Sequence, residues 1–424
     1  MLGLPSLTIK SGPFPSSVMI LLSWVYVISS ILLVAELSFA AMEEDGVGEV
    51  SFSGLASKSL GNGFGALVAV MYASLSFALL VACVSGIGSL VSQWFPGMSP
   101  ALACALFPLA AGGVMGFFPF SVTDAVNRSL CFLMLVSITS LVGIGLSVAR
   151  SNVVNSFSHA SWSISATLPA IPVIVLTLGF HVITPFICKV AGNSVVEARK
   201  AVLVGGVIPL AMVLSWNLIV LGLSWGNNVA PSQDPISLLL SVNASALPAV
   251  QGFAFSALAT SLLGYAVSLP KHFIDTLGLI FRTPEESFIT SQPFFHENGD
   301  GRVGYLVYTG DSALGSCGRL TFGRHTPVLD RKPSSPSALG TLKVLISPVI
   351  LASSVLVASF FQSAFSRALA FAGVYANCFL FGILPPLMVY IQLLRGKLRS
   401  DTIPGGYATL LLLFSISVAL GIYH

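Results

Sequence analysis

The sequence carries very little charge. Its 424 residues include 19 Lys and Arg and 16 Asp and Glu, so charged side chains make up only 8% of the chain. Soluble domains carry about a quarter. This scarcity excludes a soluble enzyme, a disordered chain and a nucleic-acid binder with a basic face. The 55% of hydrophobic residues instead indicate an integral membrane protein whose surroundings are a lipid bilayer.

Cysteine is scarce as well. The chain has 6 cysteines, and none has the CxxC spacing of metal or redox motifs. Neither a disulfide framework nor a metal site is indicated, and no motif predicts a cofactor. We expect the cysteines to pack as small hydrophobic side chains.

Apolar runs are what the sequence has in abundance. A helix that crosses the roughly 30 Å hydrocarbon layer needs about 20 mostly apolar residues. The runs lack the strict alternation of barrel strands, so an all-α polytopic protein is expected. Ten stretches are long enough: 15–41, 65–92, 100–121, 129–149, 168–190, 201–224, 247–269, 342–362, 367–394 and 405–423.

Residues 1–10 are apolar but span only half that length, and no basic region marks them as a signal peptide. We interpret them as the second half of a helix whose first half is missing. With this fragment as helix 1, the ten spans become helices 2 to 11. Residues 1–275 then hold the helix 1 fragment and helices 2–8, and residues 342–424 hold helices 9–11.

Lys and Arg are distributed unequally between the two sides of this topology. The loops after the even-numbered helices carry 16 of them, and the remaining 3 lie on the other side. The positive-inside rule places the even-numbered loops in the cytoplasm or stroma. One of these, the polar segment 283–340, is rich in Gly, Ser and Pro, and we expect it to be largely disordered.

Ionisable groups inside apolar spans are costly and tend to be functional. Glu36 near the end of helix 2 and His181 in the middle of helix 6 are the two candidates. Glu36 is either a proton-coupling carboxylate or a side chain that reaches the interface or a neighbouring helix. His181 is either a packed, hydrogen-bonded histidine or part of a binding site.

Glycine and proline interrupt two of the helices. Gly3 and Pro5 interrupt helix 1 within Leu2–Ser6, and Gly179 interrupts helix 6 between Leu178 and Phe180. Discontinuous helices at matching positions of two halves mark transporters built from inverted repeats. The five-helix separation predicts a five-plus-five repeat with one extra C-terminal helix.

Three hydroxyl-bearing residues are further candidates. Tyr72 of helix 3 could line a cavity. Thr260 and Ser261 of helix 8 could coordinate Na⁺, or they could donate to carbonyls of their own helix.

Several motifs resemble a known family. The sequence is similar to the bacterial tyrosine- and tryptophan-specific permeases and their plant homologues, in the hydroxy and aromatic amino acid permease family of the amino acid–polyamine–organocation superfamily. The resemblance rests mainly on helices 6 and 7, with support elsewhere, in these segments: Leu178-Gly-Phe-His181, Pro185, Glu197-Ala-Arg-Lys200, Gly206-Val-Ile-Pro209, Trp216-Asn-Leu, Leu2-Gly-Leu-Pro5, Glu36, Ser85-Gly-Ile-Gly88, Asp124-Ala-Val-Asn-Arg128, Thr260-Ser-Leu-Leu-Gly264 and Phe381-Gly-Ile-Leu-Pro385.

The resemblance implies a secondary transporter of tyrosine- or tryptophan-like amino acids that works by alternating access with a proton or sodium gradient. The open helix ends around Gly3, Leu4, Pro5 and Ser6 and around Leu178 and Gly179 are then expected to bind the substrate carboxylate and ammonium. The resemblance also implies that Tyr72, Phe180 and His181 bind the substrate. Glu36, Thr260 and Ser261 are expected to bind the coupling ion.

One departure from the family pattern is that its Gly-rich first half of helix 1 has no counterpart here. We interpret the sequence as an incomplete gene product that also lacks its targeting peptide. The alternative is a truncated, transport-incompetent relative that acts as a membrane partner or scaffold. The plant-like resemblance suggests the chloroplast envelope, and otherwise the plasma membrane. An intramembrane enzyme is disfavoured, because His181 has no orienting carboxylate in the sequence pattern.

Overall fold

The structure of the protein is a computed structural model, in which most of the helices are described. The described residues are 4–47, 50–156, 161–163, 167–192, 194–226, 243–281, 297–298, 302–306, 320–323, 338–360, 378–398 and 406–423.

Helices make up nearly all of this part of the chain. Helix is present in each of the ten expected spans, so that prediction is confirmed. The first half contains α1 (Leu4–Thr8), α2 (Pro13–Asp45), α3 (Phe52–Leu60), α4 (Asn62–Trp94), α5 (Pro100–Phe117) and α6 (Phe120–Ser156). The second half contains η1 (Leu168–Ala170), α8 (Ile171–Leu178), η2 (His181–Ile183), α9 (Thr184–Val190), α10 (Val195–Gly226), η3 (Ala244–Ala246), α12 (Leu247–Phe281), α13 (Ala338–Phe360), the π-helix η4 (Cys378–Ile383), α15 (Leu384–Leu394) and α16 (Gly406–Tyr423).

Six segments of the described residues are long and apolar enough to cross a membrane, and four more apolar helices are shorter. Local sequence sets where they begin and end. In α2, Gly12 at φ +84° precedes Pro13, whose missing N–H is not needed at a helix start. Gly46 at φ +63° then ends α2 in the left-handed conformation that favours glycine.

A small antiparallel sheet lies between α12 and α13 in sequence. Its strands β1 (Glu297–Asn298), β2 (Arg302–Leu306) and β3 (Leu320–Gly323) pair in the order β1-β2-β3. They fall within 283–340, the segment expected to be largely disordered. Residues 338–340 begin α13, and the rest of that segment lies outside the described residues.

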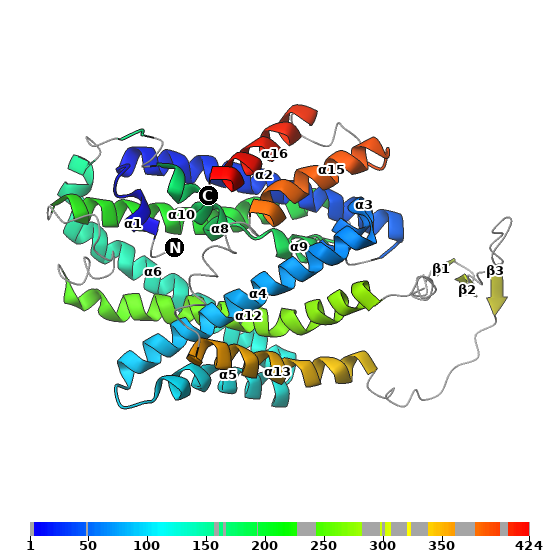
Figure 1. Cartoon of the computed structure of the whole chain (residues 1–424), viewed down its shortest axis with the longest axis horizontal. Helices are drawn as coiled ribbons and strands as arrows, with labels where there is room; N and C mark the ends of the chain where they lie inside the picture. Colours follow the sequence, from blue (N-terminus) through cyan, green and yellow to red (C-terminus); the bar gives the residue numbers. More distant parts are fainter. Residues whose placement is uncertain are drawn as a thin grey trace.

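Helices that are equivalent in two five-helix repeats pack against each other. The pairs α2–α10, α4–α12 and α5–α13 are in contact, and the α4–α5 contact of the first repeat recurs as α12–α13 in the second. Likewise, the α6–α10 contact recurs as α15–α2. Figure 1 shows α5 beside α13 along one side of the bundle, with α15 and α16 along the opposite side. This arrangement is the inverted-repeat transporter fold that the two interrupted helices predicted.

The core divides into apolar clusters. The largest joins α2, α8, α10, η4 and α15, and a second joins α4, α5, α12 and α13. A buried polar network crosses the first region. The Thr8 hydroxyl donates to Asn217 Oδ1 at 2.6 Å, and Asn217 Nδ2 donates to Ser16 Oγ at 2.9 Å. These bonds tie α1, α10 and α2 together where all three side chains are buried.

The close approach of η4 to its neighbours depends on Gly382. A Cβ at this position would lie 2.6 Å from Tyr26 Oη and 2.7 Å from Ser417 Oγ. Those two oxygens are themselves hydrogen-bonded at 2.6 Å and join α2 to α16. The Ser417 hydroxyl donates to the Leu413 carbonyl, so the Tyr26 hydroxyl is the donor of the pair.

The substitution Gly382→Ala should destabilise the protein by about 1–3 kcal/mol, because the added methyl forces η4 away from α2 and α16. Thermal unfolding in detergent would measure this as a lower midpoint. Gly421→Ala in α16 is the matched control, since a Cβ there meets nothing within 4 Å. Equal midpoints for the two variants would contradict the packing argument.

Candidate transport site at the break between α8 and α9

Helix 6 of the expected topology, residues 168–190, is broken, as its Gly and Pro predicted. Helix α8 ends at Leu178, and the backbone is extended at Gly179, with φ −78° and ψ 130°. Phe180 follows with φ −138° and ψ 32°, after which η2 and α9 resume the helical course. Pro185 lies in the first turn of α9, where its missing N–H costs no intrahelical hydrogen bond.

The break changes what the backbone can bind. A helix that stops leaves its last four carbonyl groups without intrahelical donors. These carbonyls form the negative end of the α8 dipole, which favours a cation or an ammonium group. Non-helical backbone inside a membrane bundle is stable only where protein or a polar cavity surrounds it. The end of α8 therefore has the polarity that favours an ammonium group.

An apolar cluster that extends through much of the bundle includes several residues of the predicted site. Leu4 of α1, Tyr72 of α4 and Leu178 of α8 are buried in it, and Phe180 packs against it. Phe381 of η4 belongs to the same cluster. At the break itself, the neighbouring side chain is His181, whose Nδ1 would lie 3.6 Å from a Cβ at Gly179.

His181 is fully enclosed, with 0% of its surface exposed. Its ring stacks on that of Phe381, with centroids 4.7 Å apart and planes 5° from parallel. Neither imidazole nitrogen has a hydrogen-bond partner among the described residues. His181 is therefore buried as the packing interpretation expected, but without the hydrogen bond that this interpretation assumed.

Of the remaining predicted substrate residues, the structure describes some and not others. Gly3 and the Ser6 side chain lie outside what the structure describes, whereas Leu4 and Pro5 are buried at the start of α1. Tyr72 packs edge-on against His272 of α12, with ring centroids 4.7 Å apart. The Tyr72 ring therefore lies between α4 and α12, and it also belongs to the largest apolar cluster.

Thr260 and Ser261 donate to their own helix. The Thr260 hydroxyl lies 3.0 Å from the Ala257 carbonyl oxygen, and the Ser261 hydroxyl lies 2.9 Å from the same oxygen. This is the alternative that the sequence left open. In this conformation both hydroxyls already use their protons on Ala257.

Glu36 forms an ion pair with Arg199 of α10. Arg199 Nε and Nη2 lie 2.9 Å and 2.5 Å from Glu36 Oε1. The Glu36 side chain is 11% exposed and that of Arg199 is 41% exposed, so the pair lies at the edge of the bundle rather than in its centre. The carboxylate thus contacts a neighbouring helix, one of the two interpretations offered for it.

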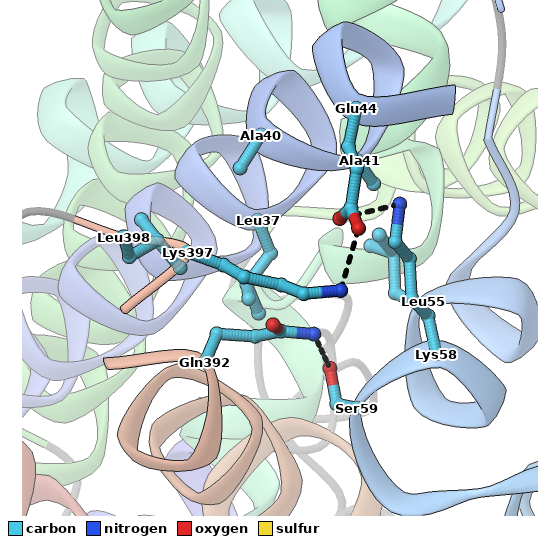
Figure 2. Close-up of a pocket in the computed structure, with 10 residues that line it drawn as sticks. All are labelled: Leu37, Ala40, Ala41, Glu44, Leu55, Lys58, Ser59, Gln392, Lys397 and Leu398. Atoms are coloured by element: carbon cyan, nitrogen blue, oxygen red, sulfur yellow. Dashed lines mark hydrogen bonds and ion pairs between the residues drawn. The ribbon is translucent and has the colours of Figure 1, made fainter. Parts of the chain in front are cut away.

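A pocket lined by both apolar and charged side chains lies where α2, α3 and α15 meet (Figure 2). Glu44 lies between two lysines there, 2.9 Å from Lys58 Nζ and 2.5 Å from Lys397 Nζ. Gln392 Nε2 donates to Ser59 Oγ at 3.1 Å. The pocket is lined by Leu37, Ala40, Ala41, Glu44, Leu55, Lys58, Ser59, Gln392, Lys397 and Leu398.

Lys58 is the central cation of this pocket. It also contacts Asp45 at 2.7 Å, while its backbone carbonyl accepts a hydrogen bond from Arg395. Burial lowers the pKa of the Lys58 ammonium, but the hydrogen bonds to Asp45 and Glu44 outweigh burial and raise that pKa above its ordinary value. The ammonium therefore stays charged at physiological pH, and the ion pairs hold α3 to α2.

Two residues next to the predicted site could not be assigned from the sequence alone. The sequence marks Phe381 only as part of a family motif, and Arg199 only as part of another such motif and as one of the loop charges. An apolar run gives no sign of which aromatic side chain will stack on a histidine. The hydrophobic pattern likewise does not show that a loop arginine reaches back to a glutamate 163 positions earlier.

These features define a class of protein: a helical membrane transporter. The fold resembles the crystal structure of a mutant manganese transporter from Eremococcus coleocola, with a TM-score of 0.56 and 11% identity over 99% of this chain and 83% of that one. A second mutant of that transporter gives a TM-score of 0.54 at 12% identity, with the same coverage. Such low identity supports the fold alone. Within the described residues, no group of three or more His, Cys, Asp or Glu could hold a metal ion.

The chain belongs to the tryptophan/tyrosine permease family, whose sequence pattern matches residues 1–424. It is 27% identical over 292 residues to tyrosine-specific transport system 1 of Haemophilus influenzae, covering 66% of this chain and 70% of that protein. Tyrosine-specific transport system 2 of the same organism is 30% identical over 150 residues, covering 34% and 36%. The family resemblance is thus confirmed, and the protein is a permease rather than an enzyme.

The Glu36–Arg199 pair can be tested by a double-mutant cycle. Arg199→Gln should lower stability by about 1–3 kcal/mol, because it leaves a largely buried carboxylate without its partner. Adding Glu36→Gln should recover part of that loss. The exposed pair Asp124–Arg128 is the control, and its cycle should give less than about 1 kcal/mol. Strictly additive effects at Glu36 and Arg199 in detergent unfolding would contradict the pairing.

The ion pairs of Glu44 with Lys58 and Lys397 should affect the local stability of α3. Glu44→Gln should speed amide hydrogen exchange across Phe52–Leu60 by about two- to fivefold, since it removes one acceptor shared by two lysines. The neighbouring Glu43→Gln removes the same charge without disturbing the pocket and should leave exchange unchanged. Equal acceleration by both variants would show that net charge alone matters.

Proposed function

We propose that the protein carries a tyrosine-like aromatic amino acid across its membrane by alternating access, coupled to a proton or sodium gradient. The single observation that carries this proposal is the extended backbone at Gly179, which lies beside the buried His181 ring that stacks on Phe381. The names of the two Haemophilus influenzae relatives, both tyrosine-specific transport systems, support the choice of substrate.

The substrate would bind with its ammonium group at the carbonyl end of α8 and its ring among the aromatic side chains. Phe180 directly follows the break, and Tyr72 belongs to the apolar cluster against which Phe180 packs. Both offer faces and edges for an aromatic ring. The substrate carboxylate is assigned to the region around Gly3 on the family resemblance.

Two groups of side chains could bind the coupling ion: the carboxylate of Glu36 for a proton, or the hydroxyls of Thr260 and Ser261 for sodium. Proton binding at Glu36 would require the carboxylate to release Arg199. Sodium binding by Thr260 and Ser261 would require their hydroxyls to turn away from the Ala257 carbonyl. Each route therefore breaks contacts that are present in this conformation.

The distribution of Lys and Arg supports an orientation with the even-numbered loops, including 283–340, in the cytoplasm or stroma. The plant-like motifs suggest the chloroplast envelope, with the plasma membrane as the other possibility. No feature of the described residues favours the alternative of a transport-incompetent scaffold.

The protein reconstituted in proteoliposomes should take up radiolabelled L-tyrosine or L-tryptophan, faster under an inward proton or sodium gradient than without one. Gly179→Ala should reduce uptake about tenfold, because its methyl would lie 3.0 Å from the Val175 carbonyl oxygen, at the proposed ammonium site. Gly205→Ala is the control, since a Cβ there meets nothing within 4 Å.

Absence of uptake of any neutral amino acid under either gradient would overturn the proposal. Equal uptake by Gly179→Ala and Gly205→Ala would leave transport intact but remove the ammonium site from the end of α8.

A further inference from the structure

His181 has hydrogen-bonding capacity that the described part of the protein does not use. A neutral imidazole carries one N–H donor and one nitrogen acceptor. Both nitrogens of His181 lack a partner among the described residues, although the side chain is 0% exposed. Buried polar atoms in native proteins are nearly always paired, so an unpaired set needs an explanation. Packing alone would be served as well by an apolar ring of the same size.

The ring of His181 is held in a defined plane. Phe381 stacks on one face, and the Phe381 backbone carbonyl accepts a hydrogen bond from the Ser30 hydroxyl at 2.7 Å. Gly382 follows directly and lets η4 approach α2 and α16. Stacking uses the face of an imidazole, whereas its hydrogen bonds lie in the ring plane. Phe381 therefore fixes the orientation of the ring and leaves both nitrogens at its edge.

The polar edge of this ring faces the helix break. A Cβ at Gly179 would lie 3.6 Å from His181 Nδ1 and 3.8 Å from Cε1. Because Gly179 has no side chain, Nδ1 lies directly beside the extended backbone that follows α8. The unpaired Nδ1 of His181 is thus located at the site that the proposed function assigns to the substrate.

We propose that His181 recognises the polar group on the ring of an aromatic substrate and so distinguishes tyrosine from phenylalanine, with Phe381 as the positioning residue. This inference rests on the proposed function. A phenol hydroxyl both donates and accepts, which complements a neutral imidazole, and an indole N–H can use the acceptor nitrogen alone. Phenylalanine offers neither group and leaves the imidazole unpaired, which is how a polar site rejects an apolar analogue.

The test is substrate competition in proteoliposomes that contain the full chain. For the wild-type protein, unlabelled tyrosine should compete for L-[³H]tyrosine uptake about tenfold better than phenylalanine does. His181→Leu should abolish this preference by weakening tyrosine and not phenylalanine. His181→Gln keeps a donor and an acceptor and should retain part of the preference. Phe381→Leu should reduce the preference without removing the nitrogens.

The outcomes separate this inference from the proposed function. A wild-type protein that transports tyrosine and phenylalanine equally well would overturn the role of His181 and leave aromatic transport standing. An equal loss of both substrates in a folded His181→Leu protein would also overturn it, because His181 would then act on the shared amino acid group or on packing. Absence of any aromatic uptake by the wild type would overturn the proposed function itself. The wild-type comparison needs no variant to fold.

Discussion

The architecture depends on how backbone polar groups are satisfied inside an apolar bundle. A continuous helix satisfies its own amides and carbonyls, but α8 stops at Leu178 and leaves its last carbonyls open. Neighbouring elements enclose this break. Helix α2 packs along α8 and η2, and η4 brings Phe381 onto His181. The close approach of η4 in turn requires Gly382. Gly382 therefore helps to enclose the break at Gly179, although the two glycines are far apart in the sequence.

Much of this arrangement could be predicted from the sequence, because local rules decide it. Twenty-residue apolar runs must be helical in a bilayer, and the described part of each expected span contains helix. The break at Gly179 followed from a glycine and Pro185 close together in one such run. Whether a residue continues a helix or adopts an extended conformation depends mainly on its near neighbours in the sequence. The position of this break could therefore be predicted without knowing how the other helices pack.

What the sequence could not show are the partners across helices. Glu36 and Arg199 are 163 positions apart, and Tyr72 meets His272 through the packing of α4 on α12. The π-helical segment Cys378–Ile383 has the composition of an ordinary apolar helix, so neither its geometry nor the stacking of Phe381 could be foreseen. Each of these features depends on how whole helices pack, and helix packing is set by many side chains at once.

The distribution of polar contacts divides the bundle into two groups of helices. The interhelical hydrogen bonds described above join α1, α2, α3, α10, η4, α15 and α16 to one another. Helices α4, α5, α12 and α13 are joined by an apolar cluster instead. Apolar contacts have no preferred direction, so they can adjust to a small displacement more easily than hydrogen bonds of fixed geometry. Tyr72 of α4 belongs to the first apolar cluster and also packs against His272 of α12, so it connects the two groups.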